Sequence, residues 1–205
     1  MTAVHTVTRK RQRKALVGAM VGHGIEWYDY GIYSFLAVFV GKLFFPEADP
    51  AVQLVSSFAV FALSFFARPL GALIFGPIAD RVGRKPALTM VIILMSGATF
   101  ALGLLPTYAQ VGVLAPILLV LVRVLQGIAA GGEVGTAVSF IAEYTGKGRR
   151  GFGTSFIMVI AVLGIVVGGV FANTLISVLG TETMLDWGWR VPFLLAGPFG
   201  MIALY

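Results

Sequence analysis

Five ionisable side chains lie inside otherwise apolar stretches of the sequence. They are Glu26, Asp29, Arg68, Arg123 and Glu133. A charged group at the centre of a bilayer costs at least about 2.5–3.5 kcal/mol, so each one marks a candidate proton or substrate site. Three acids against two arginines leave one carboxylate without a full partner, and such a carboxylate can take up and release a proton. The alternative interpretation is that the charges pair to hold a helix bundle together.

Neighbouring side chains extend this candidate site. The polar residues that recur at helical spacing on one predicted face are His23, Glu26, Tyr30 and Tyr33. Asp29 lies beside that face. His23 could belong to a proton path, although a structural histidine with satisfied hydrogen bonds is the simpler interpretation. Tyr28, Tyr30 and Tyr33 could surround a quaternary ammonium group through cation–π attraction, or could be packing residues.

The chain carries no enzyme signature. His23 and Glu26 lack the second histidine of a zinc-protease helix, and motifs for nucleophiles, phosphate loops, flavins and nicotinamides do not occur. The absence of cysteine excludes disulfides and thiolate metal sites. We therefore expect no enzyme activity, no metal site and no cofactor.

The composition is that of a membrane protein. The 205 residues are 58% hydrophobic and 12% charged, whereas a soluble domain has about 25% charged residues. So few charges cannot cover a water-soluble globule, and we expect the lipid bilayer to surround the chain. The net charge of +6 could suggest nucleic acid, but the positions of the basic residues, given below, argue against such a partner.

Apolar runs predict an all-α fold with six transmembrane helices. A span needs about 20 apolar residues, and the predicted helices cover 15–40, 52–77, 86–105, 113–143, 152–179 and 190–205. Pro106–Gln110 is predicted to form a short loop. Six helices suggest a 3+3 inverted repeat, as in many transporters.

Basic residues predict the orientation. Eleven of them fall at helix ends predicted to share one side: Arg9, Lys10, Arg11, Arg13, Lys14, Arg81, Arg84, Lys85, Lys147, Arg149 and Arg150. Only Lys42 and Arg190 fall on the other side. Because cytoplasmic loops are rich in lysine and arginine, we expect residues 1–14 to form a basic cytoplasmic tail of a multi-pass plasma-membrane protein.

Small residues predict close helix packing. Glycines at four-residue spacing occur at Gly127, Gly131 and Gly135, and again at Gly164 and Gly168. The phenylalanines at positions 58, 61, 65 and 66 are interpreted as packing and lipid-facing residues.

One segment identifies a family resemblance. Gly76–Lys85 reads GPIADRVGRK and resembles the loop between helices 2 and 3 of the major facilitator superfamily at every fixed position. Those positions are Gly76, Asp80, Arg81, Gly83, Arg84 and Lys85. Arg123–Gly127 is similar to the superfamily's helix-4 arginine motif. The resemblance implies alternating access between two six-helix halves, with this loop as a gating latch on the cytoplasmic side.

Further motifs resemble the metabolite:proton symporter group. They are Glu26–Tyr30, Arg68–Gly71, Gly131–Glu133, Ala142–Tyr144 and Asp186–Phe193. Phe44–Pro50 and Ala115–Leu119 are most similar to its osmoprotectant branch, the proline/betaine transporters. The resemblance covers residues 14–205 and implies an N-terminal half, whose C-terminal six-helix half lies in the same full-length chain or in a second chain.

The resemblance implies a proton-coupled symporter that imports a small zwitterion such as proline or glycine betaine. Glu26, Asp29 and Glu133 are then candidates for the proton or the substrate cation, and Arg68 and Arg123 for the substrate carboxylate. Two alternatives remain. One is a symporter for an organic anion of the dicarboxylate, shikimate or citrate type, and the other is a non-transporting six-helix remnant or assembly partner.

Overall fold

The structure, a computed structural model, describes residues 9–144, 148 and 150–204, with side chains in 20–133, 148 and 151–201. Every regular element in this part of the chain is helical. The elements are α1 (Arg9–Phe44), α2 (Pro50–Val82), α3 (Arg84–Leu104), α4 (Tyr108–Val111), α5 (Leu114–Tyr144), α6 (Arg150–Thr183), a π-helical turn (Met184–Gly188), α7 (Arg190–Leu194) and α8 (Ala196–Leu204).

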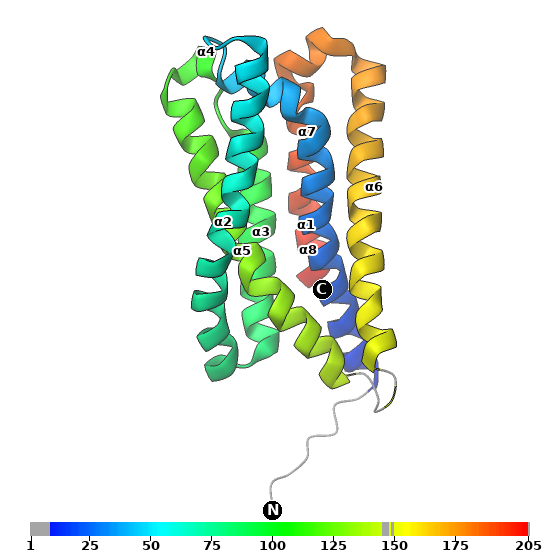
Figure 1. Cartoon of the computed structure of the whole chain (residues 1–205). Helices are drawn as coiled ribbons and strands as arrows, with labels where there is room; N and C mark the ends of the chain where they lie inside the picture. The colour runs from blue at the N-terminus through cyan, green and yellow to red at the C-terminus, as the bar shows by residue number, and fades with distance from the viewer. Residues whose placement is uncertain (1–8, 145–147, 149, 205) are drawn as a thin grey trace, which may run out of the picture.

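The long helices form the six-helix bundle that the apolar runs predict. Four segments are long and apolar enough to cross a membrane: α2, α3, Leu114–Glu133 of α5, and Gly151–Gly188, which comprises α6 and the turn after it. The other two positions are filled by α1, which carries Glu26 and Asp29, and by α7 followed by α8. The chain runs up and down through these six positions (Figure 1).

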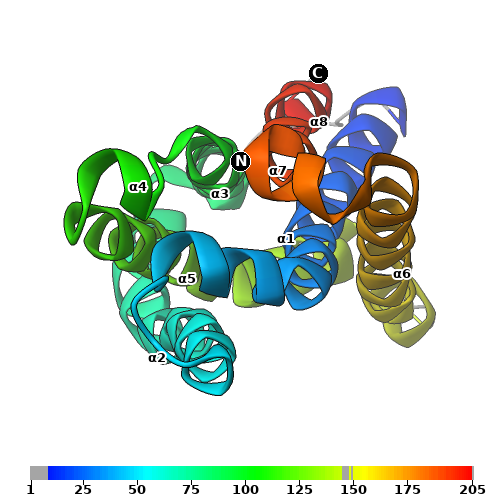
Figure 2. The ribbon, with the colours of Figure 1, turned by 90° about the horizontal axis from the view of Figure 1, so that it is seen from above.

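Two tightly packed helix pairs organise the bundle. Seen from above, α2 lies against α5 and α1 lies against α6, while α3 packs between α5 and the α7–α8 segment (Figure 2). The start of α1, the α2–α3 turn, the end of α5 and the start of α6 lie at one end of the bundle (Figure 1). The basic residues within Arg9–Lys14 and Arg81–Lys85, together with Arg150, therefore occur at one end of the molecule, whereas Lys147 and Arg149 lie outside the described residues.

Several helix ends differ from those expected. α1 begins at Arg9, inside the segment expected to be a tail, and residues 1–8 lie outside the described part of the chain. The segment expected to be a loop at Pro106–Gln110 contains the start of α4. Its first turn forms because Thr107 and Gln110 cap each other's backbone N–H groups.

The sixth predicted helix is interrupted. α7 ends at Leu194 and α8 begins at Ala196. Pro198 has no N–H to donate to the carbonyl of Leu194, which accounts for a break at this point.

Candidate functional site

One ion pair is sealed inside the bundle. Arg123 Nη1 of α5 donates to Asp29 Oδ2 of α1 over 2.6 Å, and both side chains are 0% exposed. Gln126 Nε2 donates to Asp29 Oδ1 at 3.3 Å and to Thr99 Oγ1 of α3 at 2.8 Å. The Arg123 guanidinium lies 3.8 Å from the centroid of the Tyr33 ring. Three helices therefore contribute side chains to this pair, although Arg123 Nε and Nη2 have no hydrogen-bond partner among the described residues.

A second ion pair is partly open. Arg68 Nη2 of α2 donates to Glu26 Oε1 over 2.5 Å, and the Arg68 side chain is 25% exposed while that of Glu26 is 0% exposed. Tyr30 OH donates to the same Glu26 oxygen at 2.9 Å and also accepts a hydrogen bond from Arg68. The guanidinium lies 4.7 Å from the Phe65 ring centroid and 5.4 Å from that of Tyr30. Arg68 thus contacts both the buried acid Glu26 and the exposed ring of Phe65.

A histidine and a second acid lie beside the Glu26–Arg68 pair. Together with Tyr30 these residues are called the open group below. His23 Nδ1 lies 3.1 Å from Glu133 Oε1 and 3.9 Å from Glu26 Oε2. His23, Glu26 and Glu133, hereafter the triad, are all buried. Glu26 Oε2 and Glu133 Oε2 have no hydrogen-bond partner among the side chains that the structure describes. Arg68 therefore binds Glu26, His23 lies between Glu26 and Glu133, and each carboxylate has one oxygen that could receive a proton.

Close helix contacts bring these side chains together. A Cβ on Gly131 of α5 would overlap the backbone carbonyl of Arg68, and one on Gly127 would overlap that of Ser64. Gly71 of α2 makes the reciprocal approach to Ile128. Small residues let backbones approach this closely, so the α2–α5 crossing fixes where the backbone of Arg68 lies against α5.

The glycines of α6 lie against α1. A Cβ on Gly164 would meet the carbonyl of Gly24, and one on Gly168 would meet that of Tyr28. Gly135 lies outside the residues whose side chains are described.

The structure divides the residues expected on one face of α1 between two groups. His23, Glu26 and Tyr30 join the open group, whereas Tyr33 supports the sealed pair and donates to the carbonyl of Ser57 at 3.0 Å. Ten residues separate His23 from Tyr33, which is about 15 Å along a helix. A shared face therefore does not make a shared site.

Three aromatic side chains belong to the site without having been assigned to it. Phe61 stacks on Tyr33 with ring centroids 5.1 Å apart, Phe65 lies under Arg68, and Trp27 donates to His23 Nε2 at 3.0 Å. Phe61 therefore packs, as expected, and Phe65 in addition lies under a cation, which the interpretation as a packing or lipid-facing residue did not include. Phe65 and Phe61 precede Arg68 by three and seven residues on one helix. This spacing places them on the same helix face as Arg68 and could have predicted the contact.

The segment Gly76–Lys85 is almost entirely helical. α2 continues to Val82 and α3 begins at Arg84, so only Gly83 connects them, with φ +98°. The expectation of a longer loop is wrong because a left-handed glycine suffices to reverse the chain. Asp80, Arg81 and Lys85 are exposed at this end of the bundle, and Gly76 has no atom close to where a Cβ would lie.

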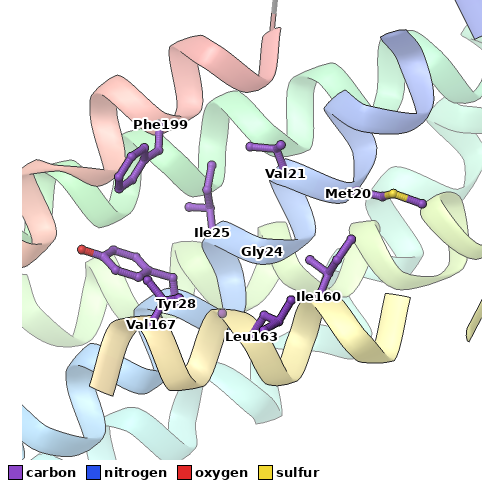
Figure 3. Close-up of a pocket in the computed structure, with 10 residues that line it drawn as sticks. Met20, Val21, Gly24, Ile25, Tyr28, Ile160, Leu163, Val167 and Phe199 are labelled. Atoms are coloured by element: carbon purple, nitrogen blue, oxygen red, sulfur yellow. The ribbon is translucent and has the colours of Figure 1, made fainter. Parts of the chain in front are cut away.

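One apolar pocket is separate from the charged groups. It has a volume of about 470 Å³, lies between α1, α6 and α8, and is lined by residues such as Ile25, Leu163 and Phe199 (Figure 3). Tyr28 lines this pocket and donates to the carbonyl of Pro192 at 3.3 Å. Tyr28 therefore does not join Tyr30 and Tyr33 around one ligand, and the pocket suits hydrocarbon better than a polar solute.

Comparison with known proteins gives the family. The model of the sugar (and other) transporter family matches residues 14–205. The chain belongs to this transporter family. Its members are transporters and not enzymes. The fold agrees, because the chain superposes on the major facilitator superfamily proton:xylose symporter XylE with a TM-score of 0.84, at 16% identity, over 97% of this chain and 44% of that one.

Curated relatives of this transporter-family chain share more of its sequence. The proline/betaine transporter of Salmonella typhimurium is 44% identical over 193 residues, which are 94% of this chain and 39% of the relative. The glycine betaine/proline/ectoine/pipecolic acid transporter OusA of Dickeya dadantii is 43% identical over 195 residues, 95% of this chain and 39% of the relative. The chain thus spans about two fifths of the length of these relatives and corresponds to the N-terminal half of a major facilitator fold.

Proposed function

We propose that the chain forms the N-terminal half of a carrier that imports a small zwitterionic osmolyte, such as proline or glycine betaine, together with protons. The names of the relatives support the substrate class. The observation that carries the proposal is the setting of Arg68. This partly exposed arginine is bound by one buried carboxylate and lies on aromatic rings.

The surroundings of Arg68 suit both ends of a zwitterion. A guanidinium recognises a carboxylate through two parallel hydrogen bonds. Aromatic faces attract ammonium groups, and the rings of Tyr30, Phe61 and Phe65 lie in mutual contact beside Arg68. A substrate whose carboxylate binds Arg68 could therefore place its cationic nitrogen on these rings.

Transport would be coupled to protons because Glu26 and the substrate carboxylate compete for Arg68. With both triad carboxylates ionised and His23 neutral, the open group carries two negative charges and one positive charge. One added proton balances them. A proton on Glu26 weakens its ion pair with Arg68, which then becomes available to a substrate carboxylate. Binding of proton and substrate would thus favour each other. Asp29 and Arg123 are sealed from this exchange and serve as support.

The complete carrier would work by alternating access in the plasma membrane. The second six-helix half would close the substrate site opposite Arg68. The exposed motif residues Asp80, Arg81 and Lys85, with Gly76, Gly83 and Arg84, would form the gating latch against that half. The basic residues at one end of the bundle support a cytoplasmic N-terminus.

The test is uptake of radiolabelled proline and glycine betaine by the complete gene product, in cells that lack other carriers for them. We expect both substrates to accumulate in the cells. Each should inhibit uptake of the other, and a protonophore should abolish accumulation of both. Inhibition by ketoglutarate or shikimate, but not by betaine, would instead assign an organic anion as substrate. Failure to transport any of these solutes would favour the non-transporting alternative.

A further inference from the structure

We infer that Trp27 is a positioning residue that fixes the protonation state of His23, and thereby reserves the triad for protons and closes it to divalent metal ions. The inference concerns the same site as the proposed function, but two of its tests do not require transport.

The contact between Trp27 and His23 determines where the imidazole carries its hydrogen. An indole N–H can only donate. Trp27 Nε1 lies 3.0 Å from His23 Nε2, so Nε2 must present its lone pair. A neutral imidazole has one lone pair on nitrogen, and the hydrogen therefore lies on Nδ1. Nδ1 faces Glu133 Oε1 at 3.1 Å, so His23 donates to Glu133.

The same contact opposes the cationic form of His23. A second proton would have to bind Nε2, where the Trp27 N–H already points, and two donors would then face each other in a buried site. Among the charged side chains, Glu133 from α5 and Glu26 from α1 favour a cationic imidazole, whereas Arg68 from α2 and burial oppose it. The Trp27 contact is therefore the feature that we infer to keep the ring neutral. Tyr30 of α1 is hydrogen-bonded to both Glu26 and Arg68. A transported proton is consequently directed to the free oxygens of Glu26 and Glu133, and not to the imidazole.

The three triad side chains, considered without Trp27, are of the types that bind metal ions. One imidazole nitrogen and one oxygen from each of the two carboxylates lie within 4.8 Å of one another. Tetrahedral Zn²⁺ with ligands at about 2.0–2.2 Å places those ligands roughly 3.3–3.6 Å apart, so small side-chain movements would suffice. Within the described part of the chain, neither Oε2 atom has a hydrogen-bond partner.

A metal ion would require the opposite form of the imidazole. It would bind the Nδ1 lone pair and leave the hydrogen on Nε2. Metal-binding histidines nearly always donate that second N–H to an acceptor, whereas here the neighbour is itself a donor. Trp27 therefore selects against metal binding by the triad.

The first test is ¹⁵N NMR of the complete carrier labelled at histidine. The His23 signal is assigned by its loss in His23→Gln. We expect a neutral ring protonated at Nδ1 in the unaltered carrier across neutral and mildly acidic pH. A cationic ring at neutral pH, or hydrogen on Nε2, would overturn the inference. This measurement needs no variant with an altered Trp27.

The second test is Zn²⁺ binding by purified carrier, measured by competition with a fluorescent chelator. Trp27→Phe keeps an aromatic ring but removes the donor, and we expect it to bind Zn²⁺ about 10- to 100-fold more tightly. His23→Gln/Trp27→Phe should lose this gain. Trp187→Phe, which alters an exposed tryptophan, should bind as the unaltered carrier does. Equal binding by Trp27→Phe and the unaltered carrier, or none by either, would overturn the inference.

A third readout connects the triad to transport. In Trp27→Phe, micromolar Zn²⁺ should inhibit proton-driven uptake, and the inhibition should weaken as the pH falls because protons compete for the same carboxylates. A carrier that transports nothing would contradict the proposed function while leaving the NMR and zinc-binding results able to support or overturn the inference.

Discussion

The two arginine–carboxylate pairs are chemically alike and differ in their surroundings. Asp29–Arg123 is wholly buried, and its acid is held by a glutamine as well as by the arginine. Glu26–Arg68 is buried only at the acid, and a second carboxylate and a histidine lie beside it. In the first pair both oxygens of the acid accept a hydrogen bond. In the second the arginine is partly exposed, and two nearby carboxylate oxygens have no hydrogen-bond partner among the described side chains.

This difference explains why intramembrane charge does not by itself identify a transport site. A buried pair can serve only to fix helices. The property that distinguishes Glu26–Arg68 is a partly exposed cation next to carboxylate oxygens that have no hydrogen-bond partner among the described side chains. The experiments below test whether the sealed pair controls stability and the open pair controls transport.

The largest expected effect is on stability, in Asp29→Asn. Arg123 would remain buried without its acid, and removing one partner of a buried pair costs about 3–5 kcal/mol. We expect a large fall in thermal stability in detergent. Asp29→Asn/Arg123→Gln should be less destabilised than Asp29→Asn alone. A melting temperature close to that of the unaltered protein would show that this pair does not hold the bundle.

Glu26→Gln should remove proton-driven accumulation by the complete carrier while substrate exchange persists. The amide preserves the shape of the side chain but cannot take up a proton. Stability should fall less than in Asp29→Asn because Arg68 is partly exposed and its charge stays accessible to water. The matched control is Glu47→Gln, at an exposed acid. Unchanged concentrative uptake by Glu26→Gln would exclude this carboxylate as the coupling group.

Gly131→Ala tests the positioning of the open pair. The added methyl group would overlap the backbone of Arg68, and overpacking costs about 1–3 kcal/mol. We expect lower stability together with weaker substrate binding, because α2 must move away from α5. Gly97→Ala, in a helix position with open space around it, is the control. Equal behaviour of the two variants in melting and uptake assays would refute the role of this crossing.

Arg68→Lys tests substrate recognition. Lysine keeps the charge but lacks the planar group that can bond Glu26 and Tyr30 while lying on Phe65. We expect KM for substrate to rise about tenfold, equivalent to roughly 1.4 kcal/mol, with only a small change in stability. Arg81→Lys, at an exposed position, should leave KM unchanged.

The sequence allowed the six helices and the buried charges to be predicted, since both depend on local hydropathy and charge. It did not predict which arginine meets which acid, because that depends on how closely α2 and α5 cross at Gly131. Phe65 was assigned to lipid because an apolar residue type does not reveal that a cation lies on its ring. The length of the α2–α3 connection was overestimated because a single residue, Gly83, reverses the chain.

The smallest expected effect on stability is at a second tyrosine–glutamate hydrogen bond, which is exposed. Tyr108 OH donates to Glu47 Oε1 at 2.8 Å, much as Tyr30 donates to Glu26 at 2.9 Å. The hydrogen bond to Glu47 raises the pKa of the Tyr108 phenol. Its small stabilisation should therefore be present below the ordinary tyrosine pKa of about 10 and be lost as the pH rises through the raised value. Tyr108→Phe should melt close to the unaltered protein at neutral pH and transport normally, whereas Tyr30→Phe should impair uptake. An equal effect of both variants on uptake would mean that burial beside Arg68 does not distinguish the two contacts.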